Sequence, residues 1–182
     1  VRSFAASISA TNFNSVEDVE VSPLDSMVYF TSKSSSRVYR FKDNKTVGNA
    51  TDVVNCTVFV GNSGSEYSIN YGAGAANEQW RDGNDNLTFD DKGNLWVLQD
   101  GGLNYIWVVR PDHTQSNPNV KLFASMPAGS EPTGLTFTPD FKYGFFSIQH
   151  PSNGNVPQMD ATFNEVAINA SASVVFALQE DL

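Results

Sequence analysis

The chain has 182 residues, a formal net charge of −9 at pH 7 and a single cysteine, Cys56. An acidic chain is poorly suited to a nucleic-acid partner, because nucleic-acid backbones are bound through clustered lysine and arginine side chains. Its apolar runs are only a few residues long, whereas a transmembrane helix needs roughly 20 apolar residues, so we expect no membrane-spanning segment. A lone cysteine also excludes an internal disulfide and a metal site built on paired cysteines.

Short runs of alternating apolar and polar residues recur along the chain, and Gly, Asn, Asp, Ser and Pro bound them. This pattern predicts strands and turns, and helical periodicity is almost absent. Three segments share one layout, in which a carboxylate is followed by a strand, a turn with Pro or Asp, and a second strand rich in aromatic residues. These segments span residues 17–30, 85–98 and 131–146, and they open with Glu17, Asp85 and Glu131.

The first two segments continue into a third strand, at residues 37–41 and 105–110. Units of about 40 to 50 residues with several strands each are typical of β-propeller blades. Residues 44–83 lengthen the first interval, and we interpret them as an outer strand near residues 58–60 followed by a long loop on one face.

The sequence therefore predicts an all-β chain with about three propeller blades and no long helix. The blade-like units lie near residues 12–60, 84–125 and 129–180, with Val19, Leu87 and Leu135 on the innermost strands. Propellers usually close with about four to eight blades. We expect the chain to be a piece of a longer propeller, although blades from a partner or an open sheet are alternatives.

The carboxylates that open the three segments are candidate metal ligands. In a propeller the first strand of each blade lines the central channel, so Glu17, Asp85 and Glu131 should face a common space. Carboxylates that lie close together repel one another, and a bound cation keeps them ionised. Their oxygens suit Ca²⁺ and could also contribute to an iron site. The structural alternative is that each acid caps a loop through backbone N–H groups.

Other polar residues cluster near these carboxylates. Asp18, Asn86 and Thr133 lie one or two residues beyond them, where they could hold the loops or the metal ligands in place. Gln149 and His150 end the strand that follows the third turn. His150 is a candidate metal ligand or general acid, or simply a channel histidine bonded to a neighbour.

Nucleophilic catalysis has little support in the sequence. The Gly-x-Ser-x-Gly motif is absent, and Cys56 has no histidine near it in the chain. The other histidine, His113, lies in a polar loop at residues 111–115 and is expected at the surface.

Four motifs follow one another along the chain. They are Glu17-Asp18 before Pro23, Asp85-Asn86-Leu87 with Gly93-Asn94-Leu95-Trp96 and Asp100-Gly101, Glu131-Pro132-Thr133-Gly134 with Thr138-Pro139-Asp140, and Gln149-His150-Pro151. In this order and spacing they resemble the C-terminal half of the propeller in PhoX-type alkaline phosphatases. The resemblance extends from about residue 12 to Phe176, with residues 44–83 and 152–170 matching only as variable loops.

The resemblance implies a six-bladed propeller that hydrolyses phosphate monoesters outside the cytoplasm, in the periplasm, at the cell surface or in the medium. It implies an axial site holding Ca²⁺ and Fe³⁺, with Glu17, Asp85 and Glu131 among the metal ligands. N-terminal blades outside these residues would supply the other ligands, including a cysteine thiolate to iron.

The chain departs from the family pattern in its first two motifs. Ser15 and Val16 stand where the first motif has Arg and Pro, and Asn84 replaces the Pro of the second. An arginine there is a natural phosphate clamp, and Arg81 is a candidate replacement. The loss of this arginine favours an alternative function, a non-catalytic binding or structural module that could still bind calcium. The retained acids and His150 favour the enzyme.

Overall fold

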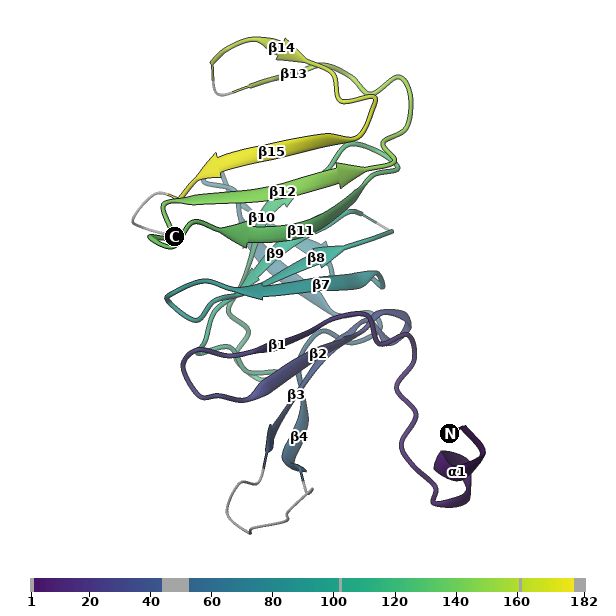
Figure 1. Cartoon of the computed structure of the whole chain (residues 1–182). Helices are drawn as coiled ribbons and strands as arrows, with labels where there is room; N and C mark the ends of the chain where they lie inside the picture. The colour runs from purple at the N-terminus through teal and green to yellow at the C-terminus, as the bar shows by residue number, and fades with distance from the viewer. Residues whose placement is uncertain (1, 44–52, 102, 161, 179–182) are drawn as a thin grey trace.

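Three antiparallel sheets stacked one on another form most of the chain in this computed structural model (Figure 1). The structure describes residues 2–43, 53–101, 103–160 and 162–178. The first sheet has the strand order β1-β2-β3-β4 and the second β10-β9-β8-β7, while the third has β11-β12-β15. The strands of the first sheet are β1 (Val19–Val21), β2 (Val28–Ser32), β3 (Arg37–Asp43) and β4 (Val53–Val60).

The second and third sheets repeat this meander. The second contains β7 (Asn84–Phe89), β8 (Leu95–Gln99), β9 (Tyr105–Val109) and β10 (Val120–Ser125). The third contains β11 (Glu131–Phe137), β12 (Tyr143–Gln149) and β15 (Ala172–Ala177). Two separate hairpins are β5 (Glu66–Asn70) with β6 (Ala75–Gln79), and β13 (Gln158–Met159) with β14 (Glu165–Val166).

Helix is scarce in the described ranges, which contain α1 (Arg2–Ser7) and the 3₁₀ turn η1 (Lys33–Ser35). The short α1 lies apart from the sheets (Figure 1). No helix in these ranges has the length and apolar character needed to cross a membrane. The predicted all-β architecture is therefore confirmed.

Acidic residues close the turns between the first two strands of each sheet. Asp90 is the most complete example, because its Oδ1 accepts the backbone N–H groups of Lys92 and Asn94 and its Oδ2 accepts the indole N–H of Trp96. Asp25 accepts the N–H of Met27 in the first sheet, and Asp140 accepts that of Lys142 in the third. These are Asx-type turns, in which a short acid satisfies the donors that a tight reversal leaves unpaired.

The first strands of the three sheets lie side by side. Strand β7 contacts both β1 and β11, and Figure 1 shows the three strands one above another. Val19, Leu87 and Leu135 lie on these strands, as predicted. The sheets are thus arranged as consecutive propeller blades, with their first strands toward a shared axis.

A repeated hydrogen-bonding pattern joins each blade to the next. Asp18 Oδ2 accepts the backbone N–H of Leu87 at 2.8 Å. One blade further on, Asn86 Oδ1 accepts the Thr133 hydroxyl at 2.6 Å and the Gly134 N–H at 3.1 Å. In both cases the residue directly after a candidate carboxylate binds the first strand of the following blade, which fixes the carboxylates relative to one another.

Two apolar clusters fill the spaces between the blades. Tyr29 and Val38 of the first blade pack with Trp107 and other residues of the second. Between the second and third blades, Trp96 and Leu98 pack with Phe146 and other residues. Burial of such side chains is the main source of stability in a fold of this kind.

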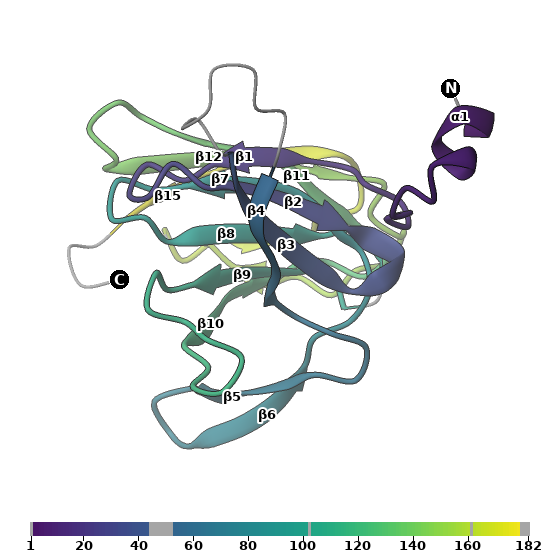
Figure 2. The ribbon, with the colours of Figure 1, turned by 90° about the horizontal axis from the view of Figure 1, so that it is seen from below.

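The interpretation of residues 44–83 as an outer strand and a long loop is wrong in its second part. The strand is β4, but the loop region contains the β5–β6 hairpin, which lies beside β10 (Figure 2). Tyr67 and Ile69 of β5 alternate with polar residues and are buried in the first apolar cluster. The glycine-rich turn at 72–74 masks this two-residue alternation in the sequence.

His113 is not a surface residue, contrary to the expectation from its polar loop. It is 2 % exposed, its Nδ1 accepts the Asn119 N–H at 3.0 Å, and its ring contacts Phe59 and Tyr67. Burial lowers the pKa of His113 and so favours its neutral form.

Parts of the predicted blade units lie outside the described residues. These parts are residues 44–52 of the first unit, residue 102 of the second, and residues 161, 179 and 180 of the third. The unit boundaries themselves stay a prediction.

Candidate functional site

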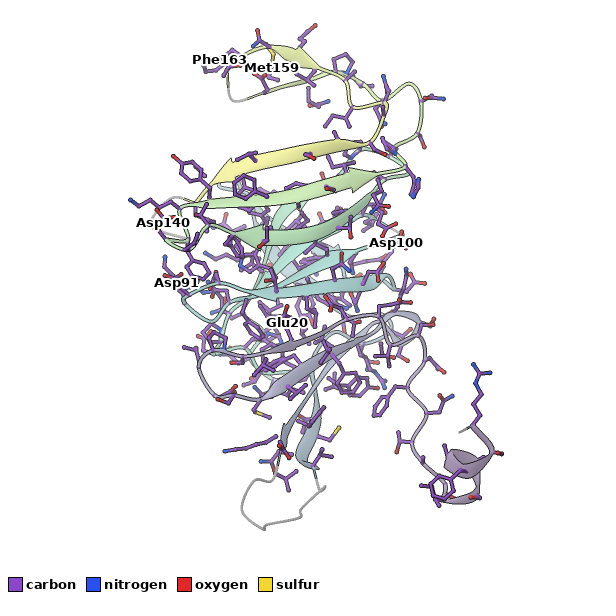
Figure 3. All side chains as sticks on the ribbon, in the orientation of Figure 1. Glu20, Asp91, Asp100, Asp140, Met159 and Phe163 are labelled. Atoms are coloured by element: carbon purple, nitrogen blue, oxygen red, sulfur yellow. The ribbon has the colours of Figure 1, made fainter. Side chains whose placement is uncertain are left out.

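Charged residues gather at one end of the three innermost hairpins. Figure 3 shows Asp100 at this end, while the turn residues Asp91 and Asp140 lie at the opposite end. Each blade contributes two positions here, one at the start of its first strand and one directly after its second. The first set is Glu17, Asp85 and Glu131, and the second set is Lys33, Asp100 and His150.

Three carboxylates from two neighbouring blades form a compact cluster. Asp85, Asp100 and Glu131 each offer an oxygen, and these atoms all lie within 4.8 Å of one another. Asp85 is 9 % exposed, so the cluster is partly shielded from water. The sequence pattern predicted Asp85 and Glu131 for this site and missed Asp100.

Hairpin register brings Asp100 into the cluster. Its backbone N–H donates to Gly83 O at 2.7 Å, which places it across the hairpin from the start of β7. Gly83 lies two positions before Asp85, so its pairing with Asp100 brings Asp100 close to Asp85. The sequence contains both residues, but the register that pairs them depends on the turn, which the local pattern alone does not fix.

Glu17 lies beside the cluster rather than within it. It is exposed, and it shares with Asp100 a polar pocket of about 350 Å³. The role of Glu17 as a metal ligand stays a prediction. The pocket is lined by Ser15, Glu17, Lys33, Ser34, Asp82, Gly83, Asp100 and Gly101.

Lys33 connects the first blade to the acids of the second. Its Nζ lies 3.1 Å from Asp85 Oδ2 and 2.5 Å from Asp100 Oδ2. Burial alone would lower the pKa of Lys33, but the hydrogen bonds to Asp100 and Asp85 raise it above its ordinary value. No local sequence pattern indicates this role, because Asp85 and Asp100 lie 52 and 67 residues after Lys33 in the chain.

The cluster carries more negative charge than Lys33 balances. Burial raises the pKa of Glu131 above its ordinary value, and the negative charges of Asp100 and Asp85 raise it further. The positive charges of Lys33 and His150 act in the opposite direction. A cation among the three oxygens would relieve this repulsion.

The predicted supporting residues take part in backbone contacts around the site. Both oxygens of Asp18 accept backbone N–H groups, those of Val19 and Leu87. Asn86 and Thr133 bond to each other across the blade boundary. Asp18, Asn86 and Thr133 thus occupy positions that hold the loops.

Gln149 and His150 lie at the end of β12, beside the start of β11. Gln149 pairs in register with Glu131. His150 follows it with an exposed side chain and a left-handed backbone, φ 53°. Both residues therefore flank the Glu131 side of the cluster.

The donor chemistry of the cluster fits a hard cation. All three groups are carboxylates, which Ca²⁺ binds in flexible geometry. Iron also accepts carboxylate oxygens but is commonly held with imidazole or thiolate as well, and this cluster of described residues contains neither.

Arg81, the candidate replacement for the family arginine, lines a different hollow. It donates to Gln79 Oε1 at 2.7 Å and faces a polar hollow of about 600 Å³ together with Arg37. This hollow adjoins the pocket of Glu17 and Lys33, since Ser34 and Asp82 line both.

Comparisons with known proteins agree with this fold and identify the family. The sequence profile of the family described as alkaline phosphatase PhoX matches residues 1–152. The chain therefore belongs to the PhoX alkaline phosphatase family, as its motifs predicted. A search of curated protein sequences found no significant match.

One solved structure shares the fold. It is Pseudomonas fluorescens PhoX in complex with vanadate, a transition state analogue, with a TM-score of 0.64 and 21 % sequence identity. The alignment covers 95 % of this chain and 35 % of that chain. The chain thus spans about a third of the length of that propeller protein.

Substitution of Gly83 tests how closely the start of β7 approaches Asp100. It has φ +97°, and a Cβ there would overlap the carbonyl group of Asp100. Gly101 has nearly the same φ, +99°, with open space around it. We expect Gly101→Ala to cost about 1–2 kcal/mol from backbone strain, and Gly83→Ala to cost a further ~1–3 kcal/mol from the overlap. Urea unfolding measures both, and equal losses would contradict the tight approach of Gly83 to Asp100.

The raised pKa of Glu131 predicts a pH dependence for the metal-free protein. Because the folded-state pKa lies above the unfolded value, the contribution of Glu131 to stability is complete below the unfolded pKa and is lost as the pH rises through the folded pKa. With chelator present, Glu131→Gln should gain stability relative to the parent protein over that rise. Thermal melts from pH 4 to 8 measure this, with the exposed Glu165→Gln as control. A pH-independent difference would show that Glu131 does not feel its acidic neighbours.

Proposed function

We propose that this chain forms the metal-binding part of a phosphatase that hydrolyses phosphate monoesters. The observation that carries the proposal is the cluster of Asp85, Asp100 and Glu131, built across a blade boundary in a chain of the PhoX family. The vanadate in the solved PhoX structure supports the assignment, because vanadate is described there as a transition state analogue.

In this proposal the three carboxylates hold the metal, and Glu17 extends the ligand set from the neighbouring pocket. Bound metal would polarise the phosphoryl group and supply an activated oxygen nucleophile. Asp18, Asn86, Thr133 and Gln149 keep the acids in position through contacts at the strand ends.

We assign His150 the role of proton donor to the leaving alcohol. Its side chain is exposed at the edge of the cluster, and its charge acts on Glu131. An imidazole has a pKa near the working range of most enzymes, so it can deliver a proton as the phosphate ester bond breaks.

The cofactors in this proposal are Ca²⁺ and Fe³⁺. The all-carboxylate cluster suits Ca²⁺ directly. Fe³⁺ would need ligands from outside these residues, in keeping with the family resemblance. The phosphate ester substrate would approach through the polar pocket beside Asp100.

The exposed apolar residues at both ends of the stack favour further blades as the partner of this chain. The first blade exposes Val19 and Val21, each 57 % exposed, and the third exposes Tyr143, Phe145 and Val175. Apolar faces of this kind usually pack against another layer. Additional blades would cover them and complete the metal site, in a protein exported to the periplasm, cell surface or medium.

Ser15 favours a second candidate function. A chain without the family arginine could be a propeller-like binding or structural module that binds calcium without hydrolysing phosphate esters. The two functions differ in activity and share metal binding, so both must be measured on the same preparation.

The test replaces each clustered acid in the full-length protein. Asp85→Asn, Asp100→Asn and Glu131→Gln should each lower metal affinity at least about tenfold and reduce phosphomonoester hydrolysis, because each removes one ligand charge. Elemental analysis and a chromogenic phosphate ester measure the two effects. The matched control is Asp112→Asn, which alters an exposed acid bonded to Asn119.

The outcomes separate the possibilities. Metal loss together with activity loss supports the phosphatase, and metal binding in a protein without activity supports the calcium-binding module. If all three variants keep both metal and activity, the acids only cap loops, since Asn caps nearly as well as Asp.

A further inference from the structure

Lys33 occupies a position at which the other two blades have a different type of residue. It follows β2 directly, as Asp100 follows β8 and His150 follows β12. The first blade therefore presents a positive charge where the second presents a negative one. This charge reaches across the blade boundary to Asp85 and Asp100.

The backbone of Lys33 is held from two sides. Its N–H donates to Ser15 O at 2.9 Å, and its carbonyl accepts the Gly83 N–H at 3.4 Å. The side chain thus starts from a fixed point between the first blade and β7. Its side chain is 25 % exposed and lines the pocket.

Lys33 is the one basic residue among those that line this pocket. The charged residues around it are Glu17, Asp82 and Asp100. A phosphate dianion entering the pocket would be repelled by these acids unless positive charge met it. The pocket, at about 350 Å³, is large compared with the roughly 30 Å³ of a water molecule, so it has room for a phosphate group.

The partners of Lys33 explain how its donors could become available. Asp85 and Asp100 are also members of the carboxylate cluster. An ammonium has three N–H donors, and a metal bound by the carboxylates would compete with Lys33 for these two oxygens and leave its donors for other acceptors. Lysine is a well-established phosphate binder that acts as a point charge.

We propose that Lys33 is a phosphate-binding residue, whose ammonium group contacts the phosphate oxygens of the substrate in place of the arginine missing at Ser15. The backbone N–H of Lys33 donates to Ser15 O, so these two positions are neighbours, and both line the pocket. The ammonium group of Lys33 therefore brings positive charge to the same pocket that Ser15 lines. This inference rests on the proposed phosphatase function.

The experiment compares Lys33→Met, which keeps most of the length of the side chain without its charge, with Lys33→Arg, which keeps the charge. Lys121→Met removes an exposed lysine on β10 and is the matched control. Inorganic phosphate is the probe, and its dissociation constant is measured by calorimetry on the full-length, metal-loaded protein. Elemental analysis gives the metal content of each variant, and steady-state kinetics gives KM and kcat.

We expect Lys33→Met to weaken phosphate binding at least about tenfold and to raise KM, because a charge-assisted hydrogen bond is lost. Metal content should stay equal to that of the parent protein, Lys33→Arg should recover much of the affinity, and Lys121→Met should change nothing.

Two results would overturn the inference. One is unchanged phosphate affinity in Lys33→Met, and the other is a loss of affinity that only follows a loss of metal, which would make Lys33 a holder of the acids. Failure of the proposed function looks different, since the parent protein itself would then bind no phosphate and hydrolyse no ester.

Discussion

The hydrogen bonds that join the first strand of each blade to the next determine where the acidic groups of the site lie. Asp18 binds the backbone of Leu87, and Asn86 binds Thr133 and Gly134. Each of these side chains follows a candidate ligand by one residue, so the same peptide segment that carries an acid also anchors the neighbouring blade. Blade packing and site geometry are consequently one arrangement, and a shift between blades would separate the carboxylates of Asp85 and Glu131.

Electrostatic repulsion is the cost of this arrangement. Three carboxylates lie within 4.8 Å of one another, and the raised pKa of Glu131 reflects both its burial and its acidic neighbours. Lys33 offsets part of the repulsion through its contacts with Asp85 and Asp100. Clusters of this kind are typical of functional sites, where stability is given up for the ability to bind a ligand.

Much of the fold could be predicted from the sequence, because strand alternation and turn chemistry are local properties. Val19, Leu87 and Leu135 lie on innermost strands as predicted, and the acids Asp85 and Glu131 come together because equivalent positions in successive blades converge. The β5–β6 hairpin escaped prediction because its two-residue alternation is short and flanked by Gly-rich sequence.

The remaining site residues depend on contacts that no local pattern encodes. Asp100 joins the cluster through the register of the β7–β8 hairpin, and Lys33 reaches it from another blade. His113 was misplaced for a related reason, since its polar loop folds back onto the rings of Phe59 and Tyr67.

The most direct test of the central claim is a crystal structure of the full-length protein grown with Ca²⁺, with anomalous scattering used to locate the ions. We predict an anomalous peak bonded to oxygens of Asp85, Asp100 and Glu131 at about 2.3–2.6 Å. A structure in which Ca²⁺ binds only elsewhere, while Lys33 still bridges Asp85 and Asp100, would contradict the claim that these strand ends form a metal site.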